Sequence, residues 1–527
     1  MSYAWWQTGT VYQIYPRSFQ DSNGDGVGDL DGVRRRLDYL VWLGVDAIWL
    51  SPFYPSPMHD FGYDVADYCN VDPLFGSLAD FDALMTEAHA RQLRIIVDFV
   101  PNHTSNAHPW FLESKSARNN PKRDWYLWRD AGPNGEPPNN WFSHFGGPAW
   151  TWDEVTQQYY LHSFLPEQPD LNWRNPQVRV AMHDVLRFWL RRGVDGFRVD
   201  VISHLIKDAA FRDNPVNPGF AGEGPDIRRL AQTYSSDQPE TQEVIAGLRR
   251  VIDEFEDRVL IGEIYLPVER LVAYYGKNLG GVHLPFNFQL IGAPWDAAEI
   301  GGLIEKYEAA LPEGAWPNWV LGNHDQPRIA ARVGAAQARV AAMLLLTLRG
   351  TPTLFYGDEI GIGHVEIPSD RVQDPWAKRE PGLNVGRDPS RTPMQWDASA
   401  FAGFSTREPW LPLTEDHRTR NVATLREDES SILSLTRNLL RYRREHAALD
   451  GGAWRLLTAE NDILAYERVH DRERVIAALN FSGEARNWKP PALSGATIAI
   501  STHGGRNGEL LAPEITLRAD EGLLISL

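Results

Sequence analysis

Short apolar runs rich in β-branched and aromatic residues alternate along the chain with segments whose apolar residues recur at helical spacing. This alternation is typical of parallel strands joined by helical crossovers. Eight strands are predicted, at residues 11–16, 46–52, 94–100, 196–201, 258–264, 283–288, 318–325 and 351–359. A helix is predicted over 176–192, ended by Gly193, with one apolar face formed by Val178, Met182, Val185, Trp189 and Leu190.

Eight strand-then-helix units predict a (β/α)8 TIM barrel, whose active site is expected in the loops at the carboxyl ends of the strands. The run "GFRVDV" (196–201) supports this interpretation, because it ends a buried pattern with Arg198 and Asp200. Charged side chains are expected where a barrel strand meets its loop, since substrate or water can satisfy them there. A doubly wound open sheet of eight parallel strands is the structural alternative.

Two connections are too long for ordinary loops. In the last part of the chain, no helical pattern separates the predicted strands. The strands "ILAYERV", "VIAALNFS", "ATIAIS" and "GLLISL" near the end predict antiparallel pairing. The predicted organisation is a barrel over 1–103 and 173–452, an inserted subdomain over 104–172 after the third strand, a long loop over 360–428 after the eighth, a final barrel helix over 430–449, and a C-terminal antiparallel β-sandwich domain over 453–527.

The composition of the chain limits the kinds of binding partner and of site that it can have. The chain has 527 residues with 52 Lys and Arg against 70 Asp and Glu, and its net charge of -18 disfavours nucleic acid and acidic membrane surfaces. Cys69 is the only cysteine, which excludes an internal disulfide and a cysteine-based zinc cluster. The first residues do not resemble a secretion signal, and no later stretch is expected to span a bilayer. We expect a soluble cytoplasmic protein.

Three carboxylates stand at predicted strand ends. Asp200 ends the fourth strand, Glu263 the fifth and Asp325 the seventh, so a barrel would aim them into one cleft. A carboxylate pair can split an acetal, because one member protonates the leaving oxygen while the other attacks or stabilises the sugar carbon. Arg198 shares a strand face with Asp200 and can keep it ionised. Taken alone, such an Arg-x-Asp pair would be interpreted as a structural ion pair.

Five ordered motifs carry a family resemblance. "DFVPNH" (98–103), "GFRVDVISH" (196–204), "GEIY" (262–265) and "GNHDQ" (322–326) resemble four signature regions of the α-amylase superfamily of glycoside hydrolases, and "QPDLN" (168–172) resembles a fifth region of its oligo-1,6-glucosidase-like members. The resemblance covers nearly the whole chain. It implies a retaining mechanism in which Asp200 is the nucleophile, Glu263 the acid/base and Asp325 the transition-state stabiliser, with Arg198 orienting Asp200.

The same resemblance implies a pocket for a terminal glucosyl group. In "HDFGYDV" (59–65), Tyr63 would stack on the sugar ring and Asp60 would accept hydrogen bonds from its hydroxyls. In "GRDPSRTPMQW" (386–396), Arg391 matches an arginine that contacts the terminal glucose, and Arg387 is the alternative. A carboxylate and an arginine at a blind end favour a closed pocket, and therefore an exo-acting enzyme on short saccharides.

Further positions bear on sugar binding and linkage. His103 and His324 resemble ligands of sugar hydroxyls in this family, although isolated histidines are more often buried structural residues. Val201 follows the expected nucleophile, and in the resembled enzymes valine there accompanies α-1,6 cleavage. Tyr265 departs from the glutamine found at its position in many oligo-1,6-glucosidases. The resemblance thus implies isomaltose-type activity with breadth to maltose-type oligosaccharides.

The stretch "DSNGDGVGD" (21–29) has oxygen side chains at alternating positions, as in a loop for a hard cation. An EF-hand is excluded because its twelfth position is Gly32 and a strand precedes it; an Asx-rich turn is the alternative. Members of the resembled family bind calcium or magnesium here. The resemblance implies a structural Ca²⁺, with Mg²⁺ as the alternative ion, bound by Asp21, Asn23, Asp25, the carbonyl of Val27, and Asp29.

Together these features predict an exo-acting retaining α-glucosidase. A transglucosidase or sucrose isomerase would use the same glucosyl-enzyme and is the first alternative. A non-catalytic carbohydrate-binding or transporter-associated relative would be expected to lose carboxylates and gain a membrane span. An endo-acting amylase would need an open groove. The sequence leaves the oligomeric state open.

Overall fold

The computed structural model describes residues 3–490 and 495–527, and its central feature is a sheet of eight parallel strands. Their order is β10, β11, β1, β2, β3, β7, β8 and β9. A parallel bridge between Asn287 and Trp319 joins the end of this order to its beginning, so the sheet closes. The predicted barrel is confirmed and the open sheet is wrong. The strands are β1 (Val11–Ile14), β2 (Ala47–Leu50), β3 (Arg94–Phe99), β7 (Gly196–Val199), β8 (Val259–Gly262), β9 (Leu284–Pro285), β10 (Asn318–Val320) and β11 (Thr351–Phe355).

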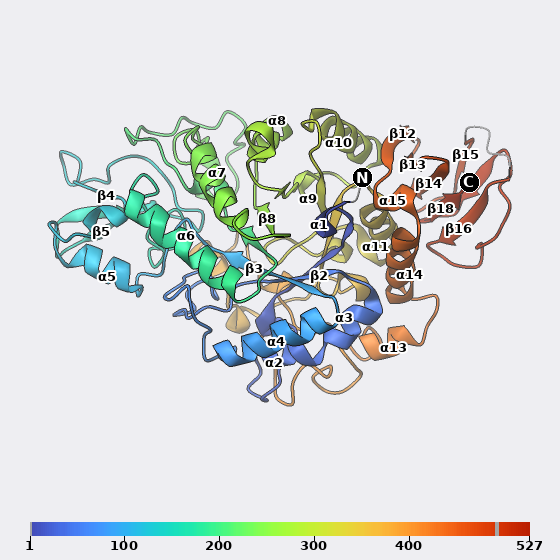
Figure 1. Ribbon diagram of the computed structural model, residues 1–527, viewed down its shortest axis with the longest axis horizontal. Coiled ribbons are helices and arrows are strands. Elements are labelled where there is room, and N and C mark those ends of the chain that lie inside the picture. The colour runs from blue at the N-terminus through green and yellow to red at the C-terminus, as the bar shows by residue number, and fades with distance from the viewer. Residues whose placement is uncertain (1–2, 491–494) are drawn as a thin grey trace.

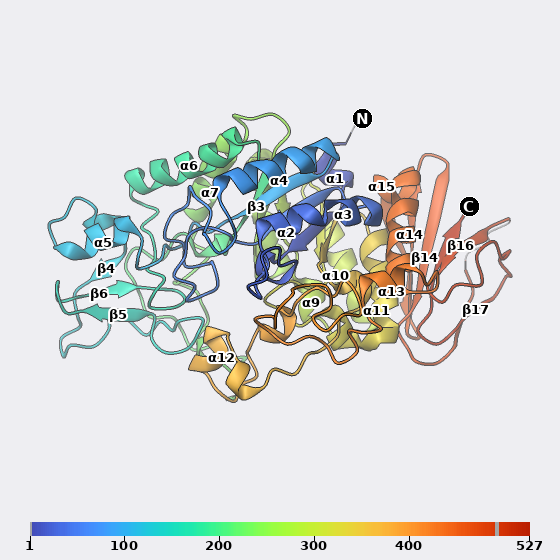
Figure 2. The same ribbon diagram turned by 90° about the horizontal axis from the view of Figure 1, so that it is seen from below.

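Helices that follow the strands surround this barrel (Figures 1 and 2). They are α2 (Leu30–Arg35), α3 (Leu37–Leu43), α4 (Leu78–Ala90), α6 (Pro176–Arg191), α7 (Thr241–Ile252), α8 (Val268–Leu271), α10 (Ala297–Ala310), α11 (Ile329–Thr347) and α14 (Ile432–Glu445). Shorter helices are α1 (Trp5–Thr8), α9 (Gln289–Gly292), α12 (Pro375–Arg379), α13 (Val422–Arg426) and α15 (Ala447–Asp450).

Helix α6 shows how local sequence sets these boundaries. The side chain of Asn175 accepts a hydrogen bond from the backbone N–H of Gln177 at 2.9 Å, and Pro176 occupies the first helical position. The helix buries the predicted apolar face. Gly193 follows its end with φ +100°, a left-handed conformation that favours glycine. The predicted helix and its stop are both confirmed.

Apolar side chains fill two layers, because every barrel strand is buried on both faces. The larger layer lies between strands and helices and includes Ile48, Val97 and Leu260. A smaller cluster fills the barrel interior, with Trp49, Ile96 and Ile261 among its members. A few buried polar side chains, among them Gln13 and Arg198, lie within the strands, and the charged groups of the site lie at or near the strand ends.

The connection after β3 contains a sheet of its own, with α5 (Pro109–Ser116) beside it. The strands are β4 (Trp128–Arg129), β5 (Trp150–Asp153) and β6 (Gln158–Leu161), in the order β4, β6, β5. Figure 1 shows this insertion at the opposite end of the molecule from the C-terminal strands. Its loops carry aromatic and histidine side chains to the cavity described below.

The last part of the chain forms two antiparallel sheets. One has the order β12, β13, β14, β18, β16 and the other pairs β15 with β17. Trp488 and Leu517 of the small sheet share an apolar cluster with Ile476 of the large one, as the predicted sandwich requires. The strands are β12 (Ala453–Glu460), β13 (Ile463–His470), β14 (Glu473–Asn480), β15 (Arg486–Trp488), β16 (Thr497–Ser501), β17 (Ile515–Leu517) and β18 (Gly522–Ser526).

Two sequence predictions about helices need correction. The predicted helix 430–449 is interrupted at His446, whose φ of -124° and ψ of 110° are extended, so α14 and α15 are separate. Helix α11 is long and apolar enough to span a bilayer by composition, with a mean hydropathy of 1.4, contrary to expectation. Most of that window is buried inside the protein, which gives α11 the pattern of a core helix.

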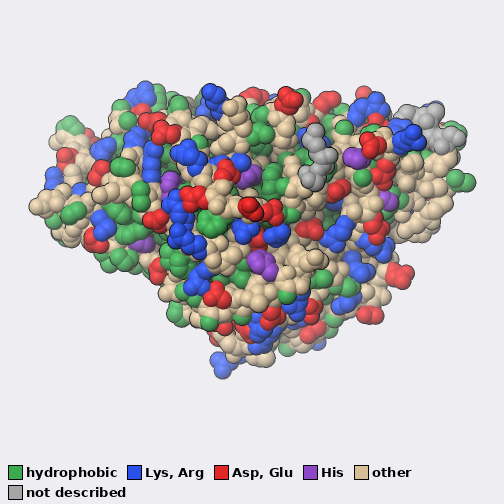
Figure 3. Space-filling view, in the orientation of Figure 1, with side chains coloured by type: hydrophobic (Ala, Val, Ile, Leu, Met, Phe, Trp, Pro, Cys, Tyr) green, Lys and Arg blue, Asp and Glu red, His purple; other side chains and the backbone are tan. Residues whose placement is uncertain are grey.

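Acidic and basic side chains are interspersed on the face shown in Figure 3. Many form surface ion pairs, such as Arg187 with Glu254 at 2.6 Å.

Candidate active site

Three carboxylates from different strands line one cavity of 850 Å³. Asp200 directly follows β7, Glu263 directly follows β8, and Asp325 lies in the loop after β10. Asp200 and Glu263 are almost fully buried. The structure thus brings together all three residues that the sequence predicted as catalytic.

Arg198 holds the first two carboxylates in place. Its guanidinium is fully buried, and its Nη1 lies 2.8 Å from Oδ1 of Asp200 while its Nη2 lies 2.7 Å from Oε2 of Glu263. Nη1 is also 2.9 Å from Oδ1 of Asp98, at the end of β3. Because neighbouring nitrogens of one guanidinium contact both Asp200 and Glu263, these two carboxylates lie close together in the cavity.

The surroundings give the carboxylates different pKa values. Burial raises the pKa of Asp200, and the guanidinium of Arg198 opposes that rise. Burial likewise raises the pKa of Glu263, which favours its protonated form. Burial alone would raise the pKa of Asp325 too, but a neighbouring histidine and three arginines lower it below its ordinary value. Burial thus favours the protonated form of both Asp200 and Glu263, whereas Asp325 is held as an anion in the same site.

The turn after Asp200 has an unusual backbone. Val201 adopts φ +36° and ψ 46°, a left-handed conformation that is strained for a β-branched residue by about 1–3 kcal/mol. In this conformation its N–H donates to Oε2 of Glu263 at 2.9 Å. The strain therefore accompanies a direct contact between the backbone beside Asp200 and the side chain of Glu263.

A network of ion pairs closes one end of the cavity. Asp60 is 3% exposed, and Oδ1 of Asp60 lies 2.7 Å from Nη2 of Arg387. The same arginine contacts Asp374 at 2.7 Å and Asp325 at 3.2 Å. Tyr265, also on the cavity wall, is 49% exposed, so the cavity reaches solvent there.

The two candidate arginines of the long loop have different places. Arg387 lines the cavity, whereas Arg391 is fully buried behind it, with Nη2 2.7 Å from Oδ1 of Asp325 and Nε donating to the carbonyl of His324 at 3.0 Å. Arg391 is not among the cavity-lining residues. The structure therefore favours the alternative, Arg387, as the arginine that faces a terminal sugar, and gives Arg391 a supporting position.

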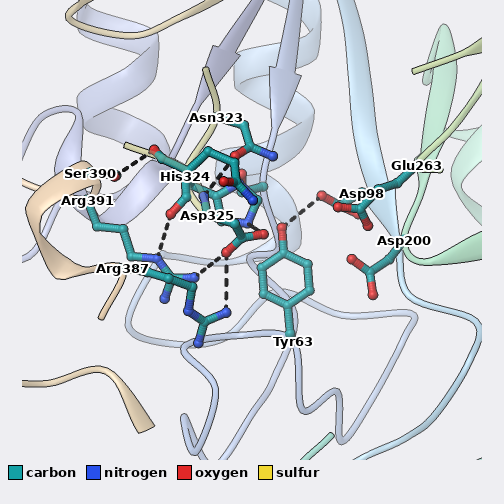
Figure 4. A network of polar contacts seen from close by, with 12 residues as sticks. Tyr63, Asp98, Asp200, Glu263, Asn323, His324, Asp325, Arg387, Ser390 and Arg391 are labelled. Carbon is teal, nitrogen blue, oxygen red and sulfur yellow. Dashed lines mark hydrogen bonds and ion pairs between the residues drawn. The ribbon is translucent and has the colours of Figure 1, made fainter. Parts of the chain in front are cut away.

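Of the predicted sugar-binding side chains, Asp60, Tyr63 and His103 line the cavity, whereas Arg198, His324 and Arg391 do not. The ring of Tyr63 stacks on His324 with centroids 5.3 Å apart, and its hydroxyl donates to Asp98 at 3.2 Å. His324 itself is fully buried and not on the cavity wall, and its Nε2 lies 3.3 Å from Asp325. Figure 4 shows Tyr63 between two groups of residues, with Asp98, Asp200 and Glu263 on one side and His324, Asp325, Arg387 and Arg391 on the other.

Burial keeps both histidines neutral. It lowers the pKa of His103 to about 4 and that of His324 to about 3. Nδ1 of His324 is within 2.8 Å of Nε2 of Gln13, which fixes the ring. The neutral imidazole of His103, on the cavity wall, can exchange hydrogen bonds with hydroxyl groups without adding charge, whereas His324 lies behind the wall and supports Tyr63 and Asp325.

The loop predicted to bind calcium is held by its own backbone. Asp21 accepts hydrogen bonds from the N–H groups of Asn23, Gly24 and Gly26, and Asp29 caps α2 through the N–H of Gly32 at 2.7 Å. Among the described residues, no three acidic, histidine or cysteine side chains are grouped as a metal site. Carboxylate oxygens can accept more than one partner, so oxygen donors from Asp21, Asn23, Asp25, Val27 and Asp29 fit the chemistry of a hard cation.

Comparison with known proteins identifies the family. The α-amylase catalytic-domain model matches residues 13–452. The chain belongs to the α-amylase family. This family member is 42% identical over 506 residues to the "Probable alpha-glucosidase" of Rhizobium meliloti, covering 92% of this chain and 91% of the relative. It is 36% identical to the "Oligo-1,6-glucosidase" of Halalkalibacterium halodurans, covering 95% of each.

Solved structures of the α-amylase family agree in fold. The alpha-glucosyl transfer enzyme XgtA superposes with a TM-score of 0.94 at 40% identity, over all of both chains. The trehalulose synthase MutB from Pseudomonas mesoacidophila superposes with a TM-score of 0.93 at 36% identity, also over both full chains. The protein is thus a glycoside hydrolase of the α-glucosidase type, and α-glucosides are its substrate class.

Several site residues escaped the sequence reasoning. Asp98 opens the quoted motif "DFVPNH" and ends β3, so its position at a strand end was the available signal. Gln168, in "QPDLN", lies within 3.3 Å of Asp60 and 3.1 Å of His103. Asp374 lies in the irregular long loop, where neither periodicity nor a strand end could have marked it.

Proposed function

We propose that the protein is an exo-acting, retaining α-glucosidase that releases terminal glucose from short α-linked oligosaccharides, with α-1,6 (isomaltose-type) activity and breadth to maltose-type substrates. The observation that carries this proposal is the single guanidinium of Arg198 in contact with both Asp200 and Glu263, in a cavity that ends at Asp60 and Arg387. Retaining enzymes need their two carboxyl groups only about 5–5.5 Å apart, so that no water fits between nucleophile and sugar.

The reaction follows from these positions. A terminal glucosyl group lies at the closed end against Tyr63, with its hydroxyls near Asp60, Arg387 and His103. Asp200 attacks the anomeric carbon while Glu263 gives its proton to the leaving oxygen, and the aglycone departs as an alcohol. Glu263, now ionised, takes a proton from water. That water attacks the anomeric carbon, and Asp200 leaves with its carboxylate restored.

Asp325 stabilises the positive charge that develops on the sugar between these steps. Its lowered pKa keeps it anionic at neutral pH. Its ion pairs with Arg387 and Arg391 fix its direction. A fixed anion beside an oxocarbenium-like centre lowers the barrier without reorganisation during the reaction.

Anomer-resolved NMR tests this proposal. With isomaltose or maltose as substrate, the first glucose released should be the α-anomer, and Glu263→Gln should lower its rate of release by orders of magnitude. If β-glucose appears first, the retaining mechanism is wrong. If starch is cleaved internally faster than disaccharides, the exo-acting pocket is wrong.

Glucosyl transfer is the second candidate function, because the similar proteins include XgtA, an alpha-glucosyl transfer enzyme, and MutB, a trehalulose synthase. Both reactions would proceed through the same glucosyl-Asp200 intermediate and differ only in which hydroxyl attacks it. Chromatography of products from sucrose and from concentrated maltose separates the two. Glucose as the main product supports hydrolysis, and longer or isomeric saccharides support transfer.

We also propose that the loop 21–29 binds a structural Ca²⁺, with Mg²⁺ as the alternative ion, and that the protein works in the cytoplasm. The oxygen donors of the loop support the ion. Calorimetric titration of chelator-treated protein with Ca²⁺ should give one saturable site that Asp25→Ala removes. Heat of dilution alone would leave the Asx-rich turn as the correct interpretation.

A further inference from the structure

Two histidines from separate segments face each other on the cavity wall. His144 comes from the insertion and His204 from the turn after β7, and both line the cavity. Their Nε2 atoms lie 3.0 Å apart. The carbonyl oxygen of the Gln232 side chain is 3.4 Å from Nε2 of His204. Two imidazole nitrogens and an amide oxygen therefore converge beside the proposed active site.

Each imidazole is held in place by its own segment. The backbone N–H of His144 donates to the carbonyl of Ser163 at 2.9 Å, and its ring stacks on Phe164 with centroids 4.9 Å apart. His204 ends the short helix Ile202–His204, and its Nδ1 lies 3.2 Å from Oγ of Ser203. Each ring thus has contacts within its own segment, and the two rings also contact each other across 3.0 Å between their Nε2 atoms, so the pair is preformed.

Both rings are neutral near pH 7. Burial lowers the pKa of His144 to about 4, and burial followed by the proximity of His144 lowers the pKa of His204 well below its ordinary value. Neutral rings place only one hydrogen between the two Nε2 atoms. Moving that hydrogen to Nδ1 of its ring, through solvent, exposes two nitrogen lone pairs with no change in charge.

We propose that His144 and His204 form a binding site for a tetragonal divalent transition-metal ion, Cu²⁺ or Ni²⁺, whose remaining ligands would be water. A metal–nitrogen distance of about 2.0–2.1 Å and the observed separation of 3.0 Å give a nitrogen–metal–nitrogen angle of about 95°. Square-planar and octahedral ions favour an angle near 90°, and mixed nitrogen and oxygen ligands suit Cu²⁺ and Ni²⁺. A tetrahedral zinc ion would need the two nitrogens about 3.4 Å apart.

The site lies on the cavity wall, four residues beyond Asp200 in sequence. A bound ion with its water ligands would occupy space that the leaving group of a substrate needs, so we expect inhibition. This consequence rests on the proposed glucosidase function. Binding itself rests only on the positions of the two imidazoles and can be measured without any substrate.

Isothermal titration of the full chain with Ni²⁺ tests the site. Wild type should show one saturable site, and His144→Ala and His204→Ala should each weaken it at least tenfold. The matched control is His364→Ala, which removes an exposed histidine in the long loop and should leave binding unchanged. Glu263→Gln should also retain Ni²⁺ while losing turnover, which separates failure of the metal site from failure of the proposed function. Unchanged binding in both histidine variants, or no saturable binding in wild type, would overturn the proposal.

Electron paramagnetic resonance of Cu²⁺ bound to wild type provides a second test that needs no variant to fold. Two equatorial imidazole nitrogens are expected in its hyperfine pattern. A spectrum with one nitrogen or none would also overturn the proposal.

Discussion

Replacing Arg198 with methionine tests the central ion pairs of the site. Methionine keeps much of the apolar length of arginine but removes the charge shared by Asp98, Asp200 and Glu263. Three carboxyl groups would then be buried together without a cation. Their simplest relief is to bind protons, which disables Asp200 as a nucleophile.

The expected loss of turnover in Arg198→Met follows from the burial of the ion pair between Arg198 and Asp200. Removing one partner of a buried ion pair is destabilising by about 3–5 kcal/mol. If ionised Asp200 is destabilised by the lower part of that range, the turnover at neutral pH drops by about 10²–10³-fold, since each 1.4 kcal/mol is a factor of ten. Arg198 opposes the rise that burial causes in the pKa of Asp200, so its loss moves that pKa upward. The acidic limb of the kcat/KM profile must therefore move to higher pH.

The assay is kcat/KM for maltose and isomaltose between pH 4 and pH 9, with circular dichroism to verify folding. The matched control is Arg94→Met, which removes ion pairs to Asp195 and Asp257 at the start of β3. Arg94 is partly exposed at the barrel end remote from the cavity, so the acidic limb of the kcat/KM profile should not move in Arg94→Met. A folded Arg198→Met enzyme with an unmoved acidic limb would refute the reasoning.

Three further predictions concern single side chains. Burial raises the pKa of Glu263, and the acid must be protonated to act, so activity should fall as pH rises through this pKa. In Glu263→Gln, this basic limb should be missing from the pH profile of the residual rate. A basic limb that persists in the variant would belong to another group. Arg387→Leu should raise KM for disaccharides about 10²-fold by leaving Asp60 unpaired at the closed end, and a KM within twofold of wild type would remove Arg387 from sugar binding. Val201→Ala should shift the isomaltose-to-maltose ratio of kcat/KM toward maltose. An unchanged ratio would show that Val201 does not set the preference for the α-1,6 linkage.

The sequence was sufficient for the barrel because its strands are short, fully buried apolar runs, a pattern that survives without tertiary information. The same pattern located Asp200 and Glu263, since a charged residue that ends such a run must lie at the rim of the barrel. Periodicity could not locate the break at His446, because the apolar face continues on both sides of it.

The long loop after β11 was less predictable. Arg387 and Arg391 lie four residues apart in irregular backbone, and only tertiary packing decides which of them faces the cavity. The pairing of His144 with His204 was equally hidden, because it joins two loops that are distant in sequence.

Trapping the glucosyl-enzyme tests the account most directly. A ring-fluorinated α-glucosyl fluoride, whose covalent intermediate forms quickly and is hydrolysed slowly, should add one fluoroglucosyl group per chain with release of fluoride. Peptide mass spectrometry should locate that group on Asp200. A label on another carboxylate, or full turnover with no covalent adduct and β-glucose as the first product, would contradict the account.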